Sequence, residues 1–416
     1  MKTPGYYEYC NRVKVISGHQ VLESIPQYLQ ELKSKNPLII TDQGVSGVGL
    51  VDIVLQAMGR SDIPVFDNVP ADSDLQTVRA IAEVYRTNHC DAIIAIGGGS
   101  VIDTAKGVNV LVSLGGDNLM RFAGSGKVKS RLKPLLVIPT TSGTGSEVTL
   151  VAVIADHERS VKLGFVSYNL LPDIAILDSR MTQTLPPHLT ALTAMDALSH
   201  ACEAYTCLSK NPLSDGDALL AIRLIGNNII KSITNPDDLD ARLALAHGST
   251  LAGAAFSNSM VGMVHSLGHA TGGVCHVPHG TCMSIFLPYG LEYNLKKVEP
   301  LIAELLFPLA GETVFASTPK EQRAHKAIQY IRDLNQQLFD ATNGRHSRNL
   351  GEIMDRDGNA LVPREKLPEI AKTATGDGAQ FYNPEDLDYS DFLMVLEHAW
   401  EGKALERIGF QSPNHP

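Results

Sequence analysis

The chain lacks several features that mark whole classes of protein. Its 416 residues contain no three consecutive lysines or arginines, and the formal net charge is −10. Both points argue against a dedicated surface for nucleic acid or for an anionic membrane. No apolar stretch reaches the length of a membrane span, and the N-terminal residues lack the apolar core of a secretory signal. We therefore expect a cytoplasmic protein.

Cysteine is also sparse, and no two of the six cysteines form a Cys-x-x-Cys pair. In a chain of this length, the scatter indicates reduced thiols rather than a disulfide framework. Cys202 and Cys275 lie near the candidate metal ligands described below, so metal binding by sulfur stays open. Neither has a second cysteine at ligand spacing, and the alternative is a small apolar core residue.

The length predicts two domains, because 416 residues exceed one average domain. Over the first 180 or so residues, short β-branched runs alternate with amphipathic stretches. This alternation predicts a parallel sheet covered by helices on both faces. A β-hairpin is predicted over 148–167, turning at 156–159. The other predicted strands lie at 13–17, 37–42, 63–69, 92–99, 133–141 and 173–178, and the helices at about 46–59, 74–88 and 100–114.

Near Leu185 the pattern changes, and helical patterns rich in alanine and leucine continue to about residue 340. We therefore expect an α/β domain over 1–185 and an all-α domain over 186–416. The polar segment 341–384, rich in glycine and aspartate, predicts a long surface loop. Its DRDGN stretch (355–359) looks like the start of a calcium loop. That interpretation fails, because the later glycine and glutamate of such a loop are missing, so the stretch predicts a turn.

A candidate metal site comes from two segments. Asp196 and His200 are four residues apart in a stretch without glycine or proline, so they share one face of a predicted helix. His265 and His269 repeat that spacing, and His279 follows a loop. One carboxylate with two or three imidazoles suits Fe²⁺ or Zn²⁺ and leaves a coordination position for substrate. Any single histidine of the set is equally compatible with a hydrogen-bonded core residue.

A candidate phosphate cradle lies at 92–107, where a strand, three consecutive glycines and a helix start are predicted. The glycines let backbone amides approach an anion, and Ser100 is expected to cap the helix with Asp103 as its capping-box partner. N–H groups at a helix start favour a bound phosphate. The run matches neither GxGxxG nor a P-loop, so an ordinary strand-to-helix turn stays the alternative.

A second candidate cradle lies at 138–149, which offers three consecutive hydroxyls and two glycines. Both cradles follow predicted parallel strands, at the edge where open α/β sheets bind ligands. A third candidate cofactor contact is Asp42. Its carboxylate can accept hydrogen bonds from the ribose hydroxyls and would repel a 2′-phosphate. It favours NAD over NADP, although helix capping is an alternative role.

Taken in order, these motifs resemble the iron-containing (group III) NAD-dependent alcohol dehydrogenases, which include lactaldehyde, 1,3-propanediol and butanol dehydrogenases. The match runs through GGGSVIDTAKG, PTTSGTGSEVT, DALSHACEAY and HSLGHATGG followed by HVPHG. It covers about residues 10–300, and 383–402 looks like the family's C-terminal helix. The resemblance implies a Rossmann-like dinucleotide-binding domain, a helical metal-binding domain and a homodimer or larger homo-oligomer.

Carried over residue by residue, the resemblance assigns the metal to Asp196, His200, His265 and His279. It places His269 near the nicotinamide and the metal. The region 341–380 looks longer than is usual in the family, which leaves the shape of the substrate pocket open. The cofactor contacts that the resemblance implies are Asp42, Gly97, Gly98, Gly99, Ser100, Thr140, Thr141, Ser142, Thr149 and, in the hairpin, Lys162.

The predicted activity is a metal-dependent alcohol dehydrogenase that transfers a hydride between a short-chain alcohol or diol and NAD. Fe²⁺ or Zn²⁺ would act as a Lewis acid on the alcohol oxygen. His269 either relays the alcohol proton or supports the ligands. Glu147 and Glu203 either orient ligands or lie on helix surfaces. An apolar pocket floor, which fits a small aliphatic substrate, is expected from Phe256, Met260, Val261 and Met263.

Two other classes compete with this prediction. A lyase resembling dehydroquinate synthase would also use NAD and zinc, but it needs several cations around the metal for an anionic substrate. Segments 191–206 and 253–290 contain no lysine or arginine. A non-catalytic NAD-binding scaffold is the other alternative, and a complete ligand set argues against it. The expected partner is a small alcohol or aldehyde, with no nucleic acid and no membrane.

Overall fold

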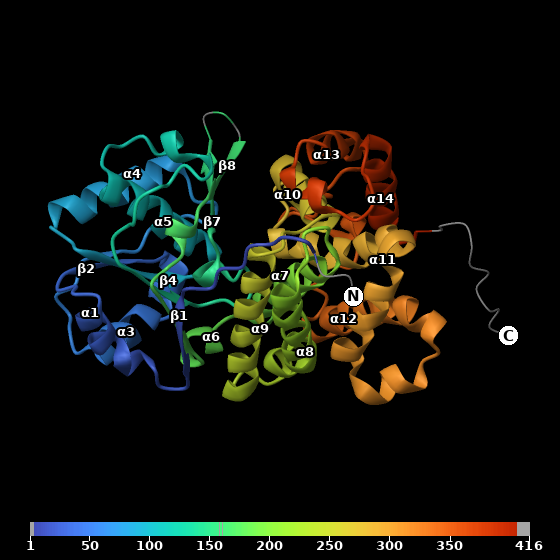
Figure 1. The fold of residues 1–416 in the computed structure, drawn as a ribbon, viewed down its shortest axis with the longest axis horizontal. Coiled ribbons are helices and arrows are strands. Elements are labelled where there is room, and N and C mark those ends of the chain that lie inside the picture. The colour runs from blue at the N-terminus through green and yellow to red at the C-terminus, as the bar shows by residue number, and fades with distance from the viewer. Residues whose placement is uncertain (1–3, 158, 160, 406–416) are drawn as a thin grey trace. The chain divides into compact units, whose positions relative to one another are not determined.

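The computed structural model describes residues 4–157, 159 and 161–405 (Figure 1). The chain divides into two compact units. The first unit comprises Met1–Tyr205 and Lys210–Ser259, and the second comprises Thr206–Ser209 and Met260–Pro416.

The first unit is built on a six-stranded sheet in the order β1-β9-β6-β4-β2-β3, with every pairing parallel. This confirms the predicted α/β class. The predicted strand over 63–69 is reduced to two residues in β3. The strands are β1 (Lys14–Gly18), β2 (Pro37–Ile40), β3 (Val65–Phe66), β4 (Ala92–Gly97), β6 (Leu135–Pro139) and β9 (Ile174–Asp178).

Alternate residues of the central strands pack into opposite layers. Ile93 lies in the core formed with α4 (Leu75–Thr87) and α5 (Gly99–Leu114). Its neighbour Ile94 lies in the core formed with α1 (Ile25–Glu31), α3 (Leu50–Met58) and α6 (Arg180–Gln183). Figure 1 shows these helices on the two sides of the sheet. Burial on both faces explains why the strands are continuous apolar runs.

The predicted hairpin is confirmed. Strands β7 (Val151–Asp156) and β8 (Val161–Val166) pair antiparallel, and β8 also pairs with the short β5 (Gly124–Ser125). Residue 158 of the predicted turn, and residue 160 just after it, lie outside the described residues. The turn begins with the carboxylate of Asp156, which accepts a hydrogen bond from the Arg159 N–H at 3.2 Å.

Long helices follow residue 185, as the sequence predicts. The helices α7 (Pro187–Thr206), α8 (Pro212–Thr234) and α9 (Leu239–Ser257) group almost entirely with the sheet in the first unit. These compact units do not test the predicted domain boundary at residue 185, which stays a prediction. The second unit contains α10 (Met263–Cys275), α11 (His279–Ser317), α12 (Arg323–Ala341), α13 (Leu367–Ala374) and α14 (Tyr389–Glu401).

One helix of the described residues, α11, is long and apolar enough to cross a membrane by length and composition alone. Its backbone leaves helical torsions at Val298 and Gly311, and it contains three prolines. Every residue from Thr281 to Leu291 is buried. The apolar window of this helix is only 28% buried, so burial does not decide its role; the breaks at Val298 and Gly311 divide α11 into shorter pieces, which argues against a membrane span.

The segment 341–384 contains the predicted long loop over 342–366, but a helix that the sequence does not predict follows it. The segment contains α13 and three short 3-10 turns, η6 (Leu350–Glu352), η7 (Arg364–Lys366) and η8 (Gly378–Tyr382). Helix α13 packs against α10 and α14, because its apolar residues recur at helical spacing along one face. The predicted turn at 355–359 is confirmed by the Asp355 carboxylate, which accepts from two backbone N–H groups of that turn.

Two glycines of the first unit meet backbone to backbone. Gly145 follows β6 with φ +62°, and Gly253 lies in α9. A Cβ on Gly253 would lie 2.7 Å from the carbonyl oxygen of Gly145, and a Cβ on Gly145 would lie 2.5 Å from the Cα of Gly253. Backbone atoms cannot rotate away as a side chain can. Only glycine therefore fits at either position.

Gly253→Ala should lower the free energy of unfolding by about 1–3 kcal/mol, the usual cost of overpacking. Gly216, in α8, is the matched control, because a Cβ there would meet no heavy atom within 4 Å. Gly216→Ala should raise the stability by about 0.5–1 kcal/mol. Denaturant unfolding of both variants checks the pair. A Gly253→Ala protein as stable as the wild type would contradict the close approach.

A buried histidine joins two helices of the second unit. His346 is fully buried, with Nε2 2.7 Å from the hydroxyl of Ser284 in α11 and 3.3 Å from the side-chain oxygen of Asn335 in α12. Burial lowers the pKa of His346 to about 4. The fold therefore favours the neutral imidazole.

Because the unfolded histidine has a pKa of about 6.5, the contribution of neutral His346 to stability is complete above that pH and is lost as the pH falls towards 4. Between pH 7 and pH 4, the wild type should lose up to about 3 kcal/mol more stability than His346→Gln. Denaturant midpoints measured at a series of pH values test this. Parallel pH profiles for the two proteins would show that His346 titrates normally.

Candidate functional site

Most of the predicted cofactor residues lie at the carboxyl ends of three neighbouring strands. β2 leads to Asp42, β4 to the three glycines and β6 to Thr140, and these strands are adjacent in the order β6-β4-β2. The Thr140 N–H donates to the carbonyl oxygen of Gly97 at 3.1 Å. In parallel α/β sheets this edge is where ligands bind. The fold thus brings the predicted segments to one edge.

The glycine turn starts α5 without a side-chain cap. Gly98 is the N-cap residue and makes no side-chain cap hydrogen bond, so backbone N–H groups of the first turn are available to a phosphate. The expected capping box is wrong, because the helix begins at Gly99 and Ser100 is already inside it. The hydroxyl of Ser100 donates to Ala71, and the carboxylate of Asp103 accepts from the Val153 N–H at 2.9 Å.

The glycine turn touches the second cradle. A Cβ on Gly98 would lie 3.1 Å from the hydroxyl of Thr141, and a Cβ on Gly99 would lie 2.7 Å from the methyl group of Thr144. Side chains at these positions would push the two loops apart. The loops therefore form one continuous surface at the edge of the sheet.

The other proposed cofactor residues have their own partners within the first unit. Asp42 caps α2 (Gln43–Gly47) by accepting from the Val45 N–H at 2.9 Å, so the capping alternative is realised. Lys162, on β8, forms an ion pair with Asp72 at 3.0 Å, and both side chains are more than half exposed. Thr149 is buried. Their contacts with a cofactor stay predictions.

In the first unit, Asp196 and His200 share one face of α7 as their spacing predicts. The Asp196 carboxylate lies 3.5 Å from Nδ1 of His200, and both residues are buried. The ring of Phe256, on α9, stacks on His200 with centroids 4.2 Å apart and an interplanar angle of 17°. Phe256, expected at the pocket floor, thus packs on a candidate ligand.

In the second unit, three imidazoles gather around the junction of α10 and α11. The rings of His265 and His279 have centroids 5.5 Å apart, and His269 lies 5.8 Å from the first and 5.4 Å from the second. The chain turns between the helices at His276, which adopts a left-handed conformation with φ +57°. His265 is buried, whereas the side chain of His269 is 45% exposed.

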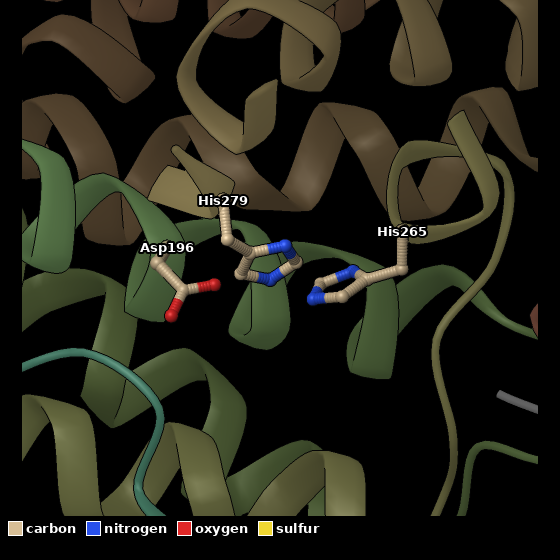
Figure 2. A group of neighbouring side chains, drawn as sticks. All are labelled: Asp196, His265 and His279. Atoms are coloured by element: carbon tan, nitrogen blue, oxygen red, sulfur yellow. The ribbon is translucent and has the colours of Figure 1, made fainter. Parts of the chain in front are cut away.

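Asp196, His265 and His279 form a group that can hold a metal ion. Each offers one ligand atom, and these atoms all lie within 4.8 Å of one another. Figure 2 shows the carboxylate and the two rings turned toward one another. One carboxylate oxygen with two imidazole nitrogens suits Fe²⁺ or Zn²⁺. His200 is not part of this group, and its role as a fourth ligand stays a prediction.

Asp377 is a site residue that the sequence patterns missed, because it lies in the segment predicted to be a loop. Its Oδ2 is 2.9 Å from Nδ1 of His269, and its Oδ1 accepts from the Ala379 N–H at 2.8 Å. Burial acts to raise the pKa of Asp377, but the hydrogen bond and charge of His269 outweigh it and hold the pKa below its usual range. The Asp377 carboxylate is therefore an anionic acceptor that fixes the orientation of the His269 ring.

Several other sequence interpretations are settled by burial. Glu147 and Glu203 are buried, so the helix-surface alternative is wrong for both. The thiols of Cys202 and Cys275 are buried, which raises their pKa. Among the described residues, neither cysteine joins the group that can hold a metal. A core role therefore fits them better. Met263, expected at the pocket floor, is fully buried.

Comparison with known proteins gives matches along nearly the whole chain. The family model described as iron-containing alcohol dehydrogenase matches residues 12–179. The model described as Fe-containing alcohol dehydrogenase family, C-terminal, matches residues 190–400. The two matches lie on either side of Leu185.

Individual relatives match over similar lengths. The chain is 32% identical to the NAD-dependent methanol dehydrogenase of Bacillus methanolicus, covering 92% of this chain and 97% of that protein. It is 32% identical to the NADPH-dependent butanol dehydrogenase of Clostridium saccharobutylicum, covering 91% and 95%. Among solved structures, a 1,3-propanediol oxidoreductase superposes with a TM-score of 0.87 at 32% identity, covering 95% of this chain and 100% of that chain.

His265→Ala should abolish stoichiometric metal binding, because it removes one of the three convergent donors. His269→Ala is the matched control, since this histidine lies one turn away on the same helix but outside the group. It should keep the metal while lowering turnover by about 10²-fold, a typical size for lost proton transfer. Asp377→Asn should also keep the metal and slow turnover. Elemental analysis of the Fe²⁺-loaded proteins gives the metal content of each variant, and steady-state kinetics gives its turnover. Loss of metal in His269→Ala would show that His269 is itself a ligand.

Proposed function

This chain belongs to the iron-containing alcohol dehydrogenase family, and we propose that it transfers a hydride between a short-chain alcohol or diol and NAD with the aid of Fe²⁺. It is an oxidoreductase. The observation that carries the proposal is the convergence of Asp196, His265 and His279 within 4.8 Å. Zn²⁺ is the alternative ion, because the same donors accept it.

We assign the metal to Asp196, His200, His265 and His279. When bound, the ion supplies Lewis-acid chemistry at the alcohol oxygen. Phe256 stacks on His200 and so restricts the ring orientation of that ligand. The helix pairing of Asp196 with His200 supports a shared role, since both donors leave α7 on the same face.

We assign dinucleotide binding to the two loops at the carboxyl edge of the sheet. Bound NAD supplies the hydride acceptor. The start of α5 offers N–H donors to the phosphates, and Asp42 offers a carboxylate to the ribose. That carboxylate favours NAD over NADP by charge repulsion. The other proposed contacts come from Ser100, Thr140, Thr141, Ser142, Thr149 and Lys162.

His269 is the proposed catalytic residue for the alcohol proton. Its Nδ1 faces the Asp377 carboxylate, so Nδ1 carries the donated hydrogen and Nε2 is the nitrogen that can take up a proton. Its half-exposed side chain gives that proton a route to water. The role of Asp377 is to hold the ring in this orientation.

Two points support a substrate class: the lack of cations in the segments that carry the proposed metal ligands, and the substrates for which the relatives are named. Segments 191–206 and 253–290 contain no lysine or arginine, which disfavours an anionic substrate. Relatives are named for methanol, butanol and 1,3-propanediol. We propose a small neutral alcohol, a homo-oligomeric protein of the cytoplasm, and domains at 1–185 and 186–416.

The deciding experiment measures NADH formation by anaerobically purified protein that has been stripped of metal and refilled with Fe²⁺ or Zn²⁺. With C1–C4 alcohols and diols, turnover should depend on the added metal and should prefer NAD over NADP. The stripped protein without added metal is the control. If no metal and no alcohol in the panel supports turnover although NAD binds, the dehydrogenase proposal fails and the lyase or scaffold class takes its place.

A further inference from the structure

One fully buried cation of the first unit has no role in the proposed chemistry. Lys106 lies in α5, two turns beyond the glycine turn, and its side chain is completely buried. Removing an ammonium group from water costs several kcal/mol unless its surroundings compensate. A methionine of similar length would fill the same space without that cost. The position therefore calls for an explanation beyond packing.

The ammonium group of Lys106 bridges to the chain that leaves the second cradle. Its Nζ donates to the carbonyl oxygen of Thr149 at 2.8 Å, to the Thr149 hydroxyl at 3.0 Å and to the carbonyl oxygen of Val151 at 2.7 Å. An ammonium group has three donors, and all three are used. Because Nζ is buried and engaged in this way, Lys106 does not itself reach a ligand.

Two buried carboxylates surround this bridge. Asp103, one turn before Lys106 on α5, accepts from the Val153 N–H of β7 at 2.9 Å. Glu147, in the 3-10 turn Ser146–Val148, accepts from the Thr250 hydroxyl of α9 at 2.7 Å. Both carboxylates interact electrostatically with Lys106. Burial lowers the pKa of Lys106 to about 8 against the opposing effect of these two charges.

The cluster of Asp103, Lys106 and Glu147 thus ties three elements together. Helix α5 begins at the glycine turn, and residues 140–149 belong to the second cradle. The third element, α9, carries Gly253, which touches Gly145 of the same cradle. Each polar bond of the cluster is directional, unlike apolar packing, so together they set the position of one cradle relative to the other.

We propose that Lys106 is a positioning residue for dinucleotide binding, which holds the 140–149 segment against the glycine turn so that both cradles face one ligand. This inference rests on the proposed function, because that function supplies the dinucleotide. Lys106 acts through Thr149 and Val151 and touches neither the cofactor nor the substrate. Its loss should therefore weaken NAD binding while metal binding remains.

The test replaces Lys106 by methionine in the full chain and titrates NADH by fluorescence. Lys106→Met should weaken NADH binding and raise the KM for NAD about tenfold or more. The metal content and the kcat at saturating NAD should stay near wild-type values. This split between KM and kcat would not follow from a purely structural role, which lowers the amount of active protein without a selective change in KM.

Arg242→Met is the matched control. Arg242 is another almost fully buried cation of the first unit, and it donates to the Thr190 hydroxyl at 2.9 Å and to the carbonyl oxygen of Pro236 at 3.3 Å. These partners lie outside both cradles. Arg242→Met should lower the Tm but leave NADH affinity unchanged. An equal loss of NADH affinity in both variants would overturn the positioning role, because it would reflect general destabilisation.

If Lys106→Met does not fold, Asp103→Asn provides the second variant. The amide oxygen of asparagine can keep the bond from the Val153 N–H, but the charge beside Lys106 is lost. A several-fold weaker NADH affinity with unchanged metal content supports the proposal, and wild-type affinity overturns it. Wild-type protein that binds no NADH overturns the proposed function as well, whereas a Lys106→Met protein with normal affinity overturns the positioning role alone.

Discussion

The backbone contact between Gly145 and Gly253 is the constraint on which much of the first unit depends. It fixes the distance between the second nucleotide cradle and α9, and no side chain can be inserted there. One turn further along α9, Phe256 stacks on His200, the metal-ligand candidate paired with Asp196. A single close approach therefore links the position of the second cradle to that of the helix that carries Asp196 and His200. Small residues at such contacts serve precise placement rather than flexibility.

The buried polar groups described above differ between the two units. The first unit buries Lys106, Asp103 and Glu147 beside the cradles, and each of the three has directional hydrogen bonds. The second unit instead buries a neutral imidazole, His346, between α11 and α12. Beside the cradles, buried charges hold two loops in one geometry, whereas a neutral polar group joins α11 to α12. The difference fits a division between ligand binding and structural support.

Local sequence patterns predicted the features that depend on local geometry. The strands are continuous apolar runs bounded by turn residues, and the pairing of Asp196 with His200 follows from helical spacing alone. The start of α5 was misjudged because a glycine can take the N-cap position that serine usually fills. The link between Asp377 and His269 crosses more than a hundred residues, and no local pattern encodes such a contact. Helix α13 escapes prediction because its few apolar residues lie in a segment otherwise rich in glycine and aspartate.

The order of the strands has a consequence for how the chain folds during synthesis. β1 leaves the ribosome before the other strands of this sheet, yet it pairs only with β9, more than 150 residues later. The strands β2, β3, β4 and β6 can assemble before that point, whereas β1 waits without its neighbour. When β9 emerges, it enters between β1 and β6 and joins the earliest part of the chain to the preassembled strands. Completion of the sheet thus waits for its last strand, which directly precedes, in the sequence, the helices that carry the proposed metal ligands.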